Sequence, residues 1–260
     1  MKLVGVTPER PCTPGLDDRL VSLLPSRAAE VEPYLTVRHV LEEAQRLSGV
    51  SVVAVSSPLA GDGKTTTAIN VAGVLGHGGG RVLLIDADLR NPGLARHLLP
   101  PNEAPGLVDA IMDPSLTLPD VVVSLPHLAF DVLPAGRSTA TPYDVVRSPR
   151  FGALLEEARG RYGCIILDTP PLIRVPDGHI IERSVDGVLV VVAANRTPRK
   201  LVAEGLRLID PAKLLGIVFN GDTERHKGYD LRVGARGSGP GGAWAGLLDR
   251  LLDTLQRWRR

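Results

Sequence analysis

The sequence predicts an α/β fold in which a doubly wound, mostly parallel sheet is flanked by helices, with an amphipathic helix at the C-terminus. Short apolar runs alternate with segments of helical periodicity along most of the chain, which is typical of this class. The hydrophobic content of 43% includes only 3% aromatic residues, so the core must be built from the aliphatic residues that fill parallel sheets. A chain of 260 residues is long enough to bury such a core.

The predicted elements follow one another in a regular order. Residues 1–30 contain four prolines and are expected to form a loosely packed arm. A helix is predicted over residues 31–47, with Pro33 confined to its first turn. The core domain, residues 31–221, is predicted to contain strands at 50–56, 81–87, 129–133, 163–168, 186–193 and 214–220, and intervening helices at 65–76, 106–112, 143–159, 178–184 and 198–209.

The C-terminal part has a different pattern. Residues 222–242 are rich in glycine, arginine and aspartate and are predicted to form a linker. Between Trp244 and Trp258, apolar residues recur at intervals of three and four, which predicts one continuous apolar face on a helix spanning residues 243–260. Its other face carries four arginines and two aspartates. Such a helix can contact a membrane surface, a partner helix or its own domain, and the sequence leaves all three open.

Composition excludes several classes of function. The net charge of +1 gives no electrostatic argument for a nucleic-acid partner. The two cysteines, Cys12 and Cys164, are far apart, which argues against a disulfide framework and against a zinc site. The chain has no uninterrupted run of about 18 apolar residues and no apolar signal core at its N-terminus. We therefore expect a cytosolic protein, or one bound to the inner face of the cytoplasmic membrane.

A glycine-rich loop between the first predicted strand and the next helix predicts a phosphate site of the P-loop NTPase type. Glycines allow backbone N–H groups to converge on phosphate oxygens, and the helix N-terminus adds partial positive charge. Lys64 is expected to reach the β- and γ-phosphates of ATP, and the Thr65 hydroxyl to bind Mg²⁺. Pro58 replaces the usual first glycine, so an ordinary strand-to-helix turn is the alternative. The predicted nucleotide-binding residues of this loop are Gly61, Asp62, Gly63, Lys64, Thr65 and Thr66.

Carboxylates follow two later strands. One apolar run ends in Asp86 and Asp88, with Arg90 close behind, and a second ends in Asp168. Because the carboxyl ends of parallel strands line the ligand crevice, these acids are expected to face the loop and to organise Mg²⁺, directly or through water. The alternative is that they cap the helices that follow. Arg90 has two interpretations, a structural partner for the carboxylates or a ligand for phosphate.

Together these segments resemble the cytoplasmic tyrosine kinases of bacterial capsule and exopolysaccharide systems. The resemblance is carried by four stretches, namely Gly61–Thr65, Leu84–Arg90, Leu133–Gly136 with Thr141-Pro142 and Ser148–Phe151, and Ile166–Pro171 with Asp177. It implies ATP-dependent autophosphorylation on tyrosine, assembly with further copies, and a polysaccharide co-polymerase or membrane adaptor as partner.

The resemblance also implies roles for individual residues. Lys64, Asp86 and Asp88 would be catalytic, with Asp86 as the base for the substrate hydroxyl. Thr65, Asp86 and Asp168 would bind the metal. Asn220, at the end of the last predicted strand, would contact the adenine, since an amide can both donate to and accept from a purine edge.

Two features depart from that family. The chain has tyrosines at 34, 143, 162 and 229 and lacks the family's tyrosine-rich tail. Tyr229 is interpreted as a solvent-facing tyrosine in preference to a phosphorylation site. The family's oligomerisation motif, Glu-x-x-Arg-x-x-Arg, is represented by Glu32, Leu35 and Arg38, so one arginine is lost. Arg38 and Glu42 are instead expected to form an exposed helical pair of small energetic weight.

Two alternatives to a tyrosine kinase stay open. The partitioning and septum-positioning ATPases carry a second lysine early in the loop where this chain has Leu59, but a helix that returns to a membrane is a trait of theirs. The other alternative is a non-catalytic regulator of polysaccharide export that binds nucleotide but has lost the tyrosine tail.

Overall fold

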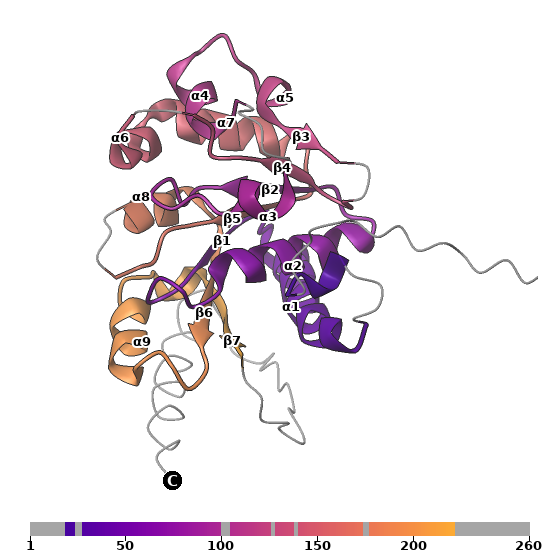
Figure 1. Cartoon of the computed structure of the whole chain (residues 1–260), viewed down its shortest axis with the longest axis vertical. Coiled ribbons are helices and arrows are strands. Elements are labelled where there is room, and N and C mark those ends of the chain that lie inside the picture. Colours follow the sequence, from indigo (N-terminus) through magenta and orange to yellow (C-terminus); the bar gives the residue numbers. More distant parts are fainter. Residues whose placement is uncertain are drawn as a thin grey trace, which may run out of the picture.

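The computed structural model describes residues 19–23, 28–99, 105–125, 128–137, 140–173 and 177–221. Within them a central seven-stranded sheet is covered by helices on both faces (Figure 1). Most of the predicted arm, the whole linker 222–242 with Tyr229, and the predicted helix 243–260 lie outside the described residues. Among the helices of the described part, none combines the length and the apolarity that crossing a lipid bilayer requires.

The sheet confirms the predicted α/β fold with a mostly parallel sheet. Its strands stand in the order β3-β4-β2-β5-β1-β6-β7, and each neighbouring pair is parallel except β3–β4. Each of the six predicted strands is present, with ends that lie within two residues of the expected ones. The strands are β1 (Val52–Ser56), β2 (Val82–Asp86), β3 (Val123–Ser124), β4 (Asp131–Leu133), β5 (Cys164–Asp168), β6 (Gly187–Ala193) and β7 (Leu214–Asn220).

The described residues contain more helical elements than the sequence predicted, because four short elements were missed and one predicted helix is divided in two. The α-helices are α1 (Ala28–Ser48), α2 (Lys64–His77), α3 (Leu94–Leu98), α4 (Leu107–Met112), α5 (Leu118–Val121), α6 (Pro142–Arg147), α7 (Pro149–Arg159), α8 (Asp177–Ser184) and α9 (Arg199–Leu206), and 3-10 turns occupy Val21–Leu23 and Pro211–Lys213. The unpredicted elements α3 and α5 and the 3-10 turns have only three to five residues each, too few to show a period of 3.6.

Two helix predictions were wrong at prolines. Helix α1 begins at Ala28, so Pro33 is its sixth residue and lies beyond the first turn. The favourable helix propensity of the residues before it extends the helix at the expense of one hydrogen bond. The single helix expected over 143–159 is two helices, because Ser148 adopts the extended conformation favoured before proline. The Ser148 hydroxyl then accepts a hydrogen bond from the amide of Arg150 and caps α7.

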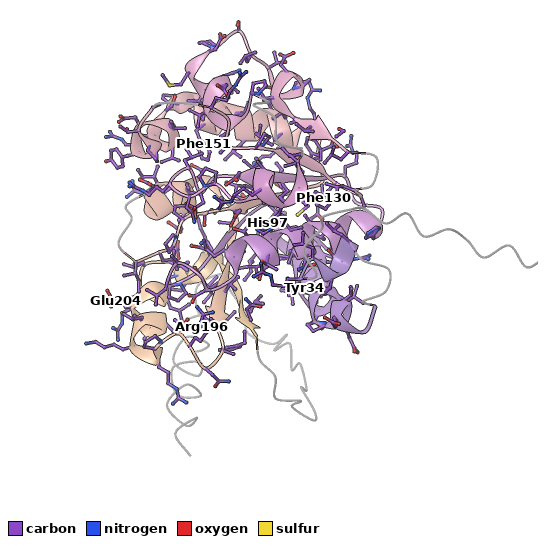
Figure 2. All side chains as sticks on the ribbon, viewed as in Figure 1. Tyr34, His97, Phe130, Phe151, Arg196 and Glu204 are labelled. Atoms are coloured by element: carbon purple, nitrogen blue, oxygen red, sulfur yellow. The ribbon has the colours of Figure 1, made fainter. Side chains whose placement is uncertain are left out.

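Alternate residues of the central strands pack into two separate cores, one on each face of the sheet. One core contains Val53, Val55 and Leu84 beneath α1 and α2. The other contains Leu83 and Ile85 beneath α4 and α6–α9, together with Phe151 of α7 (Figure 2). All residues of β1 and β2 are buried. Because β2, β5 and β1 are adjacent in the middle of this rigid sheet, the loops that follow them converge at one edge.

Candidate functional site

The loop from β1 to α2 has the backbone that a phosphate site needs. Gly61 and Gly63 have φ angles of 85° and 97°, in the left-handed region that favours glycine. A Cβ atom on Gly63 would lie 2.0 Å from the side-chain nitrogen of Asn220. Glycine is therefore required at 63 for two separate reasons, the backbone conformation and the close approach of Asn220.

Asp62 holds the loop in shape through contacts that reach distant elements. Its carboxylate accepts hydrogen bonds from the Thr197 hydroxyl at 2.6 Å and from the amide of Leu59 at 3.0 Å. Its backbone carbonyl accepts from the Asn220 amide at 2.9 Å. Sequence reasoning missed Thr197, because nothing in the sequence links a threonine after β6 to a loop 135 residues earlier. Asn220 lies against the loop, and its contact with adenine stays a prediction.

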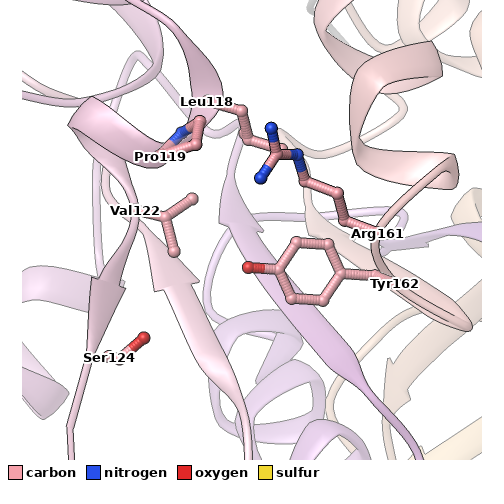
Figure 3. Close-up of a pocket in the computed structure, with 6 residues that line it drawn as sticks. All are labelled: Leu118, Pro119, Val122, Ser124, Arg161 and Tyr162. Carbon is pink, nitrogen blue, oxygen red and sulfur yellow. The ribbon is translucent and has the colours of Figure 1, made fainter.

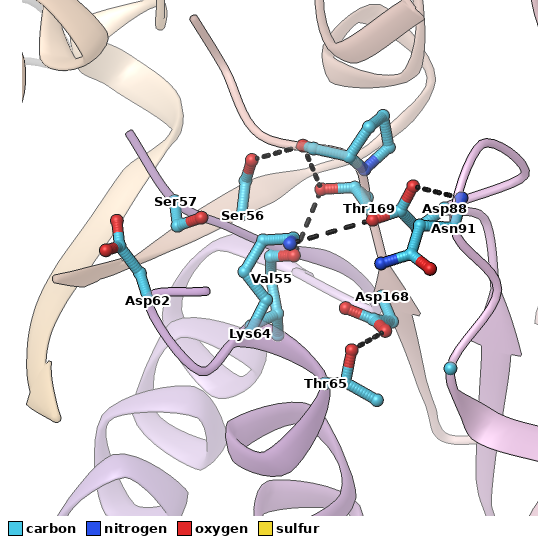
Figure 4. A network of polar contacts seen from close by, with 12 residues as sticks. Val55, Ser56, Ser57, Asp62, Lys64, Thr65, Asp88, Asn91, Asp168 and Thr169 are labelled. Atoms are coloured by element: carbon cyan, nitrogen blue, oxygen red, sulfur yellow. Dashed lines mark hydrogen bonds and ion pairs between the residues drawn. The ribbon is translucent and has the colours of Figure 1, made fainter. Parts of the chain in front are cut away.

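The predicted acidic residues meet at the carboxyl ends of β2 and β5. Asp86 and Asp168 are register partners on these neighbouring strands. The Thr65 hydroxyl donates to Asp168 at 2.6 Å, and the Lys64 ammonium lies 3.6 Å from Asp88 (Figure 4). Lys64 and Asp88 are both only 7% exposed at their side chains. The structure thus brings the glycine-rich loop and both acidic strand ends into one buried polar cluster.

One oxygen of Asp86 does cap the following helix, which was the alternative interpretation of the acidic strand ends. Oδ2 of Asp86 accepts hydrogen bonds from the amides of Gly93 at 2.9 Å and Leu94 at 3.0 Å, at the start of α3. The other oxygen, Oδ1, is buried without a hydrogen-bond partner, and so is Oδ1 of Asp168. Each buried orphan oxygen is costly unless a proton or a cation reaches it.

Burial raises the pKa of the Asp86 and Asp168 carboxyls, so both bind their protons more tightly than usual. It raises the pKa of Asp86 to about 6, against the lowering effect of the Leu94 and Gly93 amides and with a further contribution from the charge of Asp88. Burial likewise raises the pKa of Asp168 to about 8, and the charge of Asp86 adds to it. A bound cation would reverse this trend, so the two residues are suited to a site that binds a metal ion together with a nucleotide.

The donor set fits magnesium better than a metal that proteins enclose by themselves. Across the part of the chain that the structure describes, no three His, Cys, Asp or Glu side chains gather in a way that could hold a metal ion. Mg²⁺ is ordinarily held by one or two protein oxygens together with phosphates and water. Two such protein oxygens lie where the end of β5 meets the first turn of α2, namely the Thr65 hydroxyl and the orphan oxygen of Asp168.

Arg90 forms an ion pair with Asp177, a buried residue of its own domain. Its guanidinium lies against Asp177 at the start of α8, with Nε–Oδ2 at 2.6 Å and a second contact at 3.3 Å. The Asp177 side chain is only 2% exposed, whereas Arg90 is 45% exposed. Of the two interpretations of Arg90, the structure favours the structural one, although the carboxylate that Arg90 contacts is Asp177 and neither Asp86 nor Asp88. The pair joins the loop after β2 to the segment after β5.

Arg38 and Glu42 form the expected pair on α1, with Nε and Oε1 2.6 Å apart. Arg38 also donates to the carbonyl of Val74 at 3.4 Å, near the end of α2. A Cβ atom on Gly78 would lie 2.3 Å from the carbon of this guanidinium. The arginine that survives from the oligomerisation motif is therefore packed against its own domain.

Comparison with known proteins identifies the family. The model of the AAA domain matches residues 50–210. The tyrosine-protein kinase YwqD of Bacillus subtilis is 30% identical over 213 residues, which cover 81% of this chain and 89% of that protein. The succinoglycan biosynthesis transport protein ExoP of Rhizobium meliloti is 30% identical over 200 residues, 75% of this chain but only 25% of ExoP.

A solved structure gives the same assignment. The kinase domain of VpsO is 30% identical, with a TM-score of 0.62 over 74% of this chain and 98% of that domain. This match covers nearly all of the solved domain, as the match to YwqD covers most of that protein. The region that the AAA-domain model matches includes the loop and both acidic strand ends. The chain therefore belongs to the family of bacterial tyrosine kinases that are built on a P-loop AAA domain.

Proposed function

We propose that this chain is an ATP- and Mg²⁺-dependent protein-tyrosine kinase that serves exopolysaccharide or capsule biosynthesis. The observation that carries the proposal is the convergence of Lys64, Thr65 and the two acidic strand ends in one buried cluster. Its relatives support the rest, since YwqD is named a tyrosine-protein kinase and ExoP a succinoglycan biosynthesis transport protein.

The loop and Lys64 would bind the triphosphate. The backbone N–H groups of residues 61–66 lie at the N-terminus of α2, where partial positive charge favours anions. Lys64 now lies beside Asp88, and we expect its ammonium to exchange this carboxylate for the β- and γ-phosphates. Thr65 and Asp168 would hold Mg²⁺, which when bound neutralises charge on the phosphates.

Asp86 is suited to accept the proton of the tyrosine hydroxyl. Two backbone amides fix one of its oxygens, so the carboxylate cannot turn away, while the other oxygen is without a partner. A pKa of about 6 is close to the value at which a base is both deprotonated and able to take a proton near neutral pH. Asp88 would support it by holding the turn after β2, where its carboxylate accepts from the amide of Asn91 at 3.2 Å.

The proposal also includes a partner protein and a cellular location. A polysaccharide co-polymerase or membrane adaptor would be the partner at the inner face of the cytoplasmic membrane, and residues 243–260 are the segment whose sequence suits contact with a membrane surface. Assembly with other copies would bring an acceptor tyrosine to the active site. The altered motif around Leu35 and the packing of Arg38 against α2 argue for a contact other than the family's helix motif.

The test is incubation of the full chain with γ-labelled ATP, with and without Mg²⁺, followed by detection of phosphotyrosine and of released phosphate. We expect Mg²⁺-dependent phosphotyrosine in the wild type and none in Lys64→Met. Lys200→Met, which removes an exposed lysine of α9, is the matched control and should behave as wild type. Phosphate release without phosphotyrosine would replace the kinase by an ATPase, and neither signal would leave a nucleotide-binding regulator.

A further inference from the structure

The proposed function requires an acceptor tyrosine, and the structure describes three candidates that differ in environment. Tyr34 of α1 packs against the core beneath α1 and α2. Burial raises the pKa of its phenol, and the hydroxyl interacts with Asn70 and Thr67 of α2. Its hydroxyl is therefore enclosed between two helices and could not meet a nucleotide without separating them.

Tyr162 is also held by its own domain. Its hydroxyl donates to Asp131 of β4 at 2.9 Å. Burial raises the pKa of this phenol, and the neighbouring carboxylate adds to the effect. The ring forms one wall of a pocket of about 200 Å³ at the antiparallel edge of the sheet (Figure 3). Phosphorylation here would place a dianion against Asp131, which like-charge repulsion opposes.

Tyr143 is the most accessible of the three. It is the second residue of α6 and is 37% exposed. Arg147, one turn later on the same helix, lies over the ring with its guanidinium carbon 5.2 Å from the centroid. A guanidinium nitrogen of Arg147 also donates to the phenol oxygen at 3.4 Å. A cation thus already lies where a phosphate on Tyr143 would be attached, and arginine pairs well with phosphate.

We propose that Tyr143 is a phosphorylation site of this chain, an assignment that rests on the proposed function. In the transfer the phenol oxygen bonds to the γ-phosphorus of ATP while the bond from that phosphorus to the bridging oxygen breaks. ADP leaves with the electron pair, and the phenol proton passes to a carboxylate of the kinase site. The product is phosphotyrosine paired with Arg147.

The packing of α6 leaves Tyr143 accessible without unfolding the helix. Val145 and Val146 of this helix are 1% and 3% exposed, and α6 packs against α8 (Figure 1). Tyr143 therefore stands at the start of a helix whose inner face is held in the core, while its own ring is exposed. Presented outward on an intact domain, the same side chain is available to a second molecule.

The test maps the labelled tyrosine in variants of the full chain. We expect Tyr143→Phe to lose most of the phosphotyrosine, whereas Tyr162→Phe and Tyr229→Phe retain the wild-type level. Tyr143→Phe should still phosphorylate a random glutamate–tyrosine copolymer at the wild-type rate, which shows that the domain is folded and active. Unchanged labelling of Tyr143→Phe would overturn the assignment and leave the kinase proposal standing. Absence of phosphotyrosine from the wild type and from the copolymer would overturn both.

A mixing experiment tests whether Tyr143 receives phosphate from another copy, as the proposed function expects. Lys64→Met, which the proposed function expects to lack kinase activity, is tagged and incubated with an equal amount of wild type and labelled ATP. We expect label on Tyr143 of the tagged chain, at a rate that rises with total protein concentration. Label confined to the wild-type chain at a concentration-independent rate would show transfer within one molecule and contradict the assembly that the proposed function includes.

Discussion

At the scale of single residues, the site is defined by groups that are unfavourable in the absence of a ligand. Asp86 and Asp168 are fully buried register partners, and each has an oxygen without a hydrogen-bond partner. The charge of Lys64 acts on Asp168, and its ammonium lies against Asp88. Phosphate and Mg²⁺ would satisfy these groups together. The cost of burying them is a free-energy reserve that ligand binding can release.

The glycine at position 63 gives a prediction about ligand binding. Gly63→Ala introduces both backbone strain at a φ of 97° and a Cβ atom 2.0 Å from the Asn220 amide, so the loop must move. We expect the affinity for Mg²⁺-ADP, measured by titration calorimetry, to fall at least about tenfold. Gly79→Ala is the control, because its φ is 86° with nothing within 4 Å of the new Cβ. Equal affinities in the two variants would contradict the role of the Asn220 contact.

The chemistry of the site residues could be predicted from local sequence, whereas their partners could not. Lys64, Thr65, Asp86 and Asp168 stand in short motifs whose spacing is set by a strand end or a helix start. The partners of Asp62 and Arg90 are 135 and 87 residues away, respectively. Such pairs depend on the order of strands in the sheet, which a single sequence does not encode as a local pattern.

At the scale of elements, an ion pair and two backbone hydrogen bonds join the end of α7, the amino end of β1 and the turn before β6. Arg159, at the end of α7, makes two contacts of 2.7 Å with Asp186. The Asp186 carboxylate also accepts from the amides of Ser51 and Val52, at 2.9 and 2.8 Å. Burial acts to raise the pKa of Asp186, but these hydrogen bonds outweigh it and lower the pKa to about 2. This carboxylate therefore stabilises the junction of α7, β1 and β6 at the edge of the sheet opposite the site.

Asp186→Asn is expected to reduce the free energy of unfolding at pH 7 by roughly 1 to 3 kcal/mol, because it weakens charge-assisted hydrogen bonds to partly buried groups. The wild-type contribution is present above about pH 4 and is lost as the pH falls toward 2, since the folded-state pKa is below that of the unfolded chain. Urea unfolding at pH 7 and pH 3 measures both effects. Glu156→Gln removes the exposed partner of the same arginine and should cost less than about 0.5 kcal/mol. A loss in Asp186→Asn as small as that of the control would refute the prediction.

Elements were predictable in proportion to their length and burial. The strands β1 and β2, which are fully buried, and β5, which is buried after its first residue, were located within two residues because a run of apolar side chains marks them. The break between α6 and α7 was missed, although the sequence contains a signal for it. Ser148 is a residue type that caps helices, and Pro149 has no backbone N–H to donate to the preceding turn. The two-residue strand β3 carries no period, and it forms only because β4 offers an edge.

At the scale of the whole molecule, the strand order places the three functional loops together. Parallel neighbours β2, β5 and β1 direct their carboxyl ends to one side, so segments starting near residues 57, 87 and 169 meet although they are far apart in the chain. The sequence predicted this convergence from the general rule for parallel sheets. It could not predict the antiparallel edge strand or the order of the outer strands, which depend on packing between distant segments.

The buried site also gives the stability of the whole molecule a characteristic dependence on pH. Burial raises the pKa of Asp168 from its ordinary 3.8 to about 8. Between these values the unfolded chain has lost the proton that the folded chain retains, so the free energy of unfolding falls as the pH rises from about 4 to about 8. Asp168→Asn removes this ionisation and keeps an acceptor for the Thr65 hydroxyl, so without Mg²⁺ or nucleotide it should be more stable than wild type at pH 8 by about 2 kcal/mol.

Denaturant unfolding at pH 5, 6.5 and 8 in a metal chelator would follow this difference. We expect Asp168→Asn to gain over wild type steadily across the series, and the difference to shrink when Mg²⁺ and ADP are added, because the bound cation favours the ionised wild-type carboxylate. Asp113→Asn is the control, since hydrogen bonds from Ser115 lower the pKa of this exposed carboxyl and leave it ionised over the whole series. If wild type and Asp168→Asn lose stability in parallel, Asp168 is already ionised in the ligand-free protein, and the energetic reserve attributed to the site does not come from this residue.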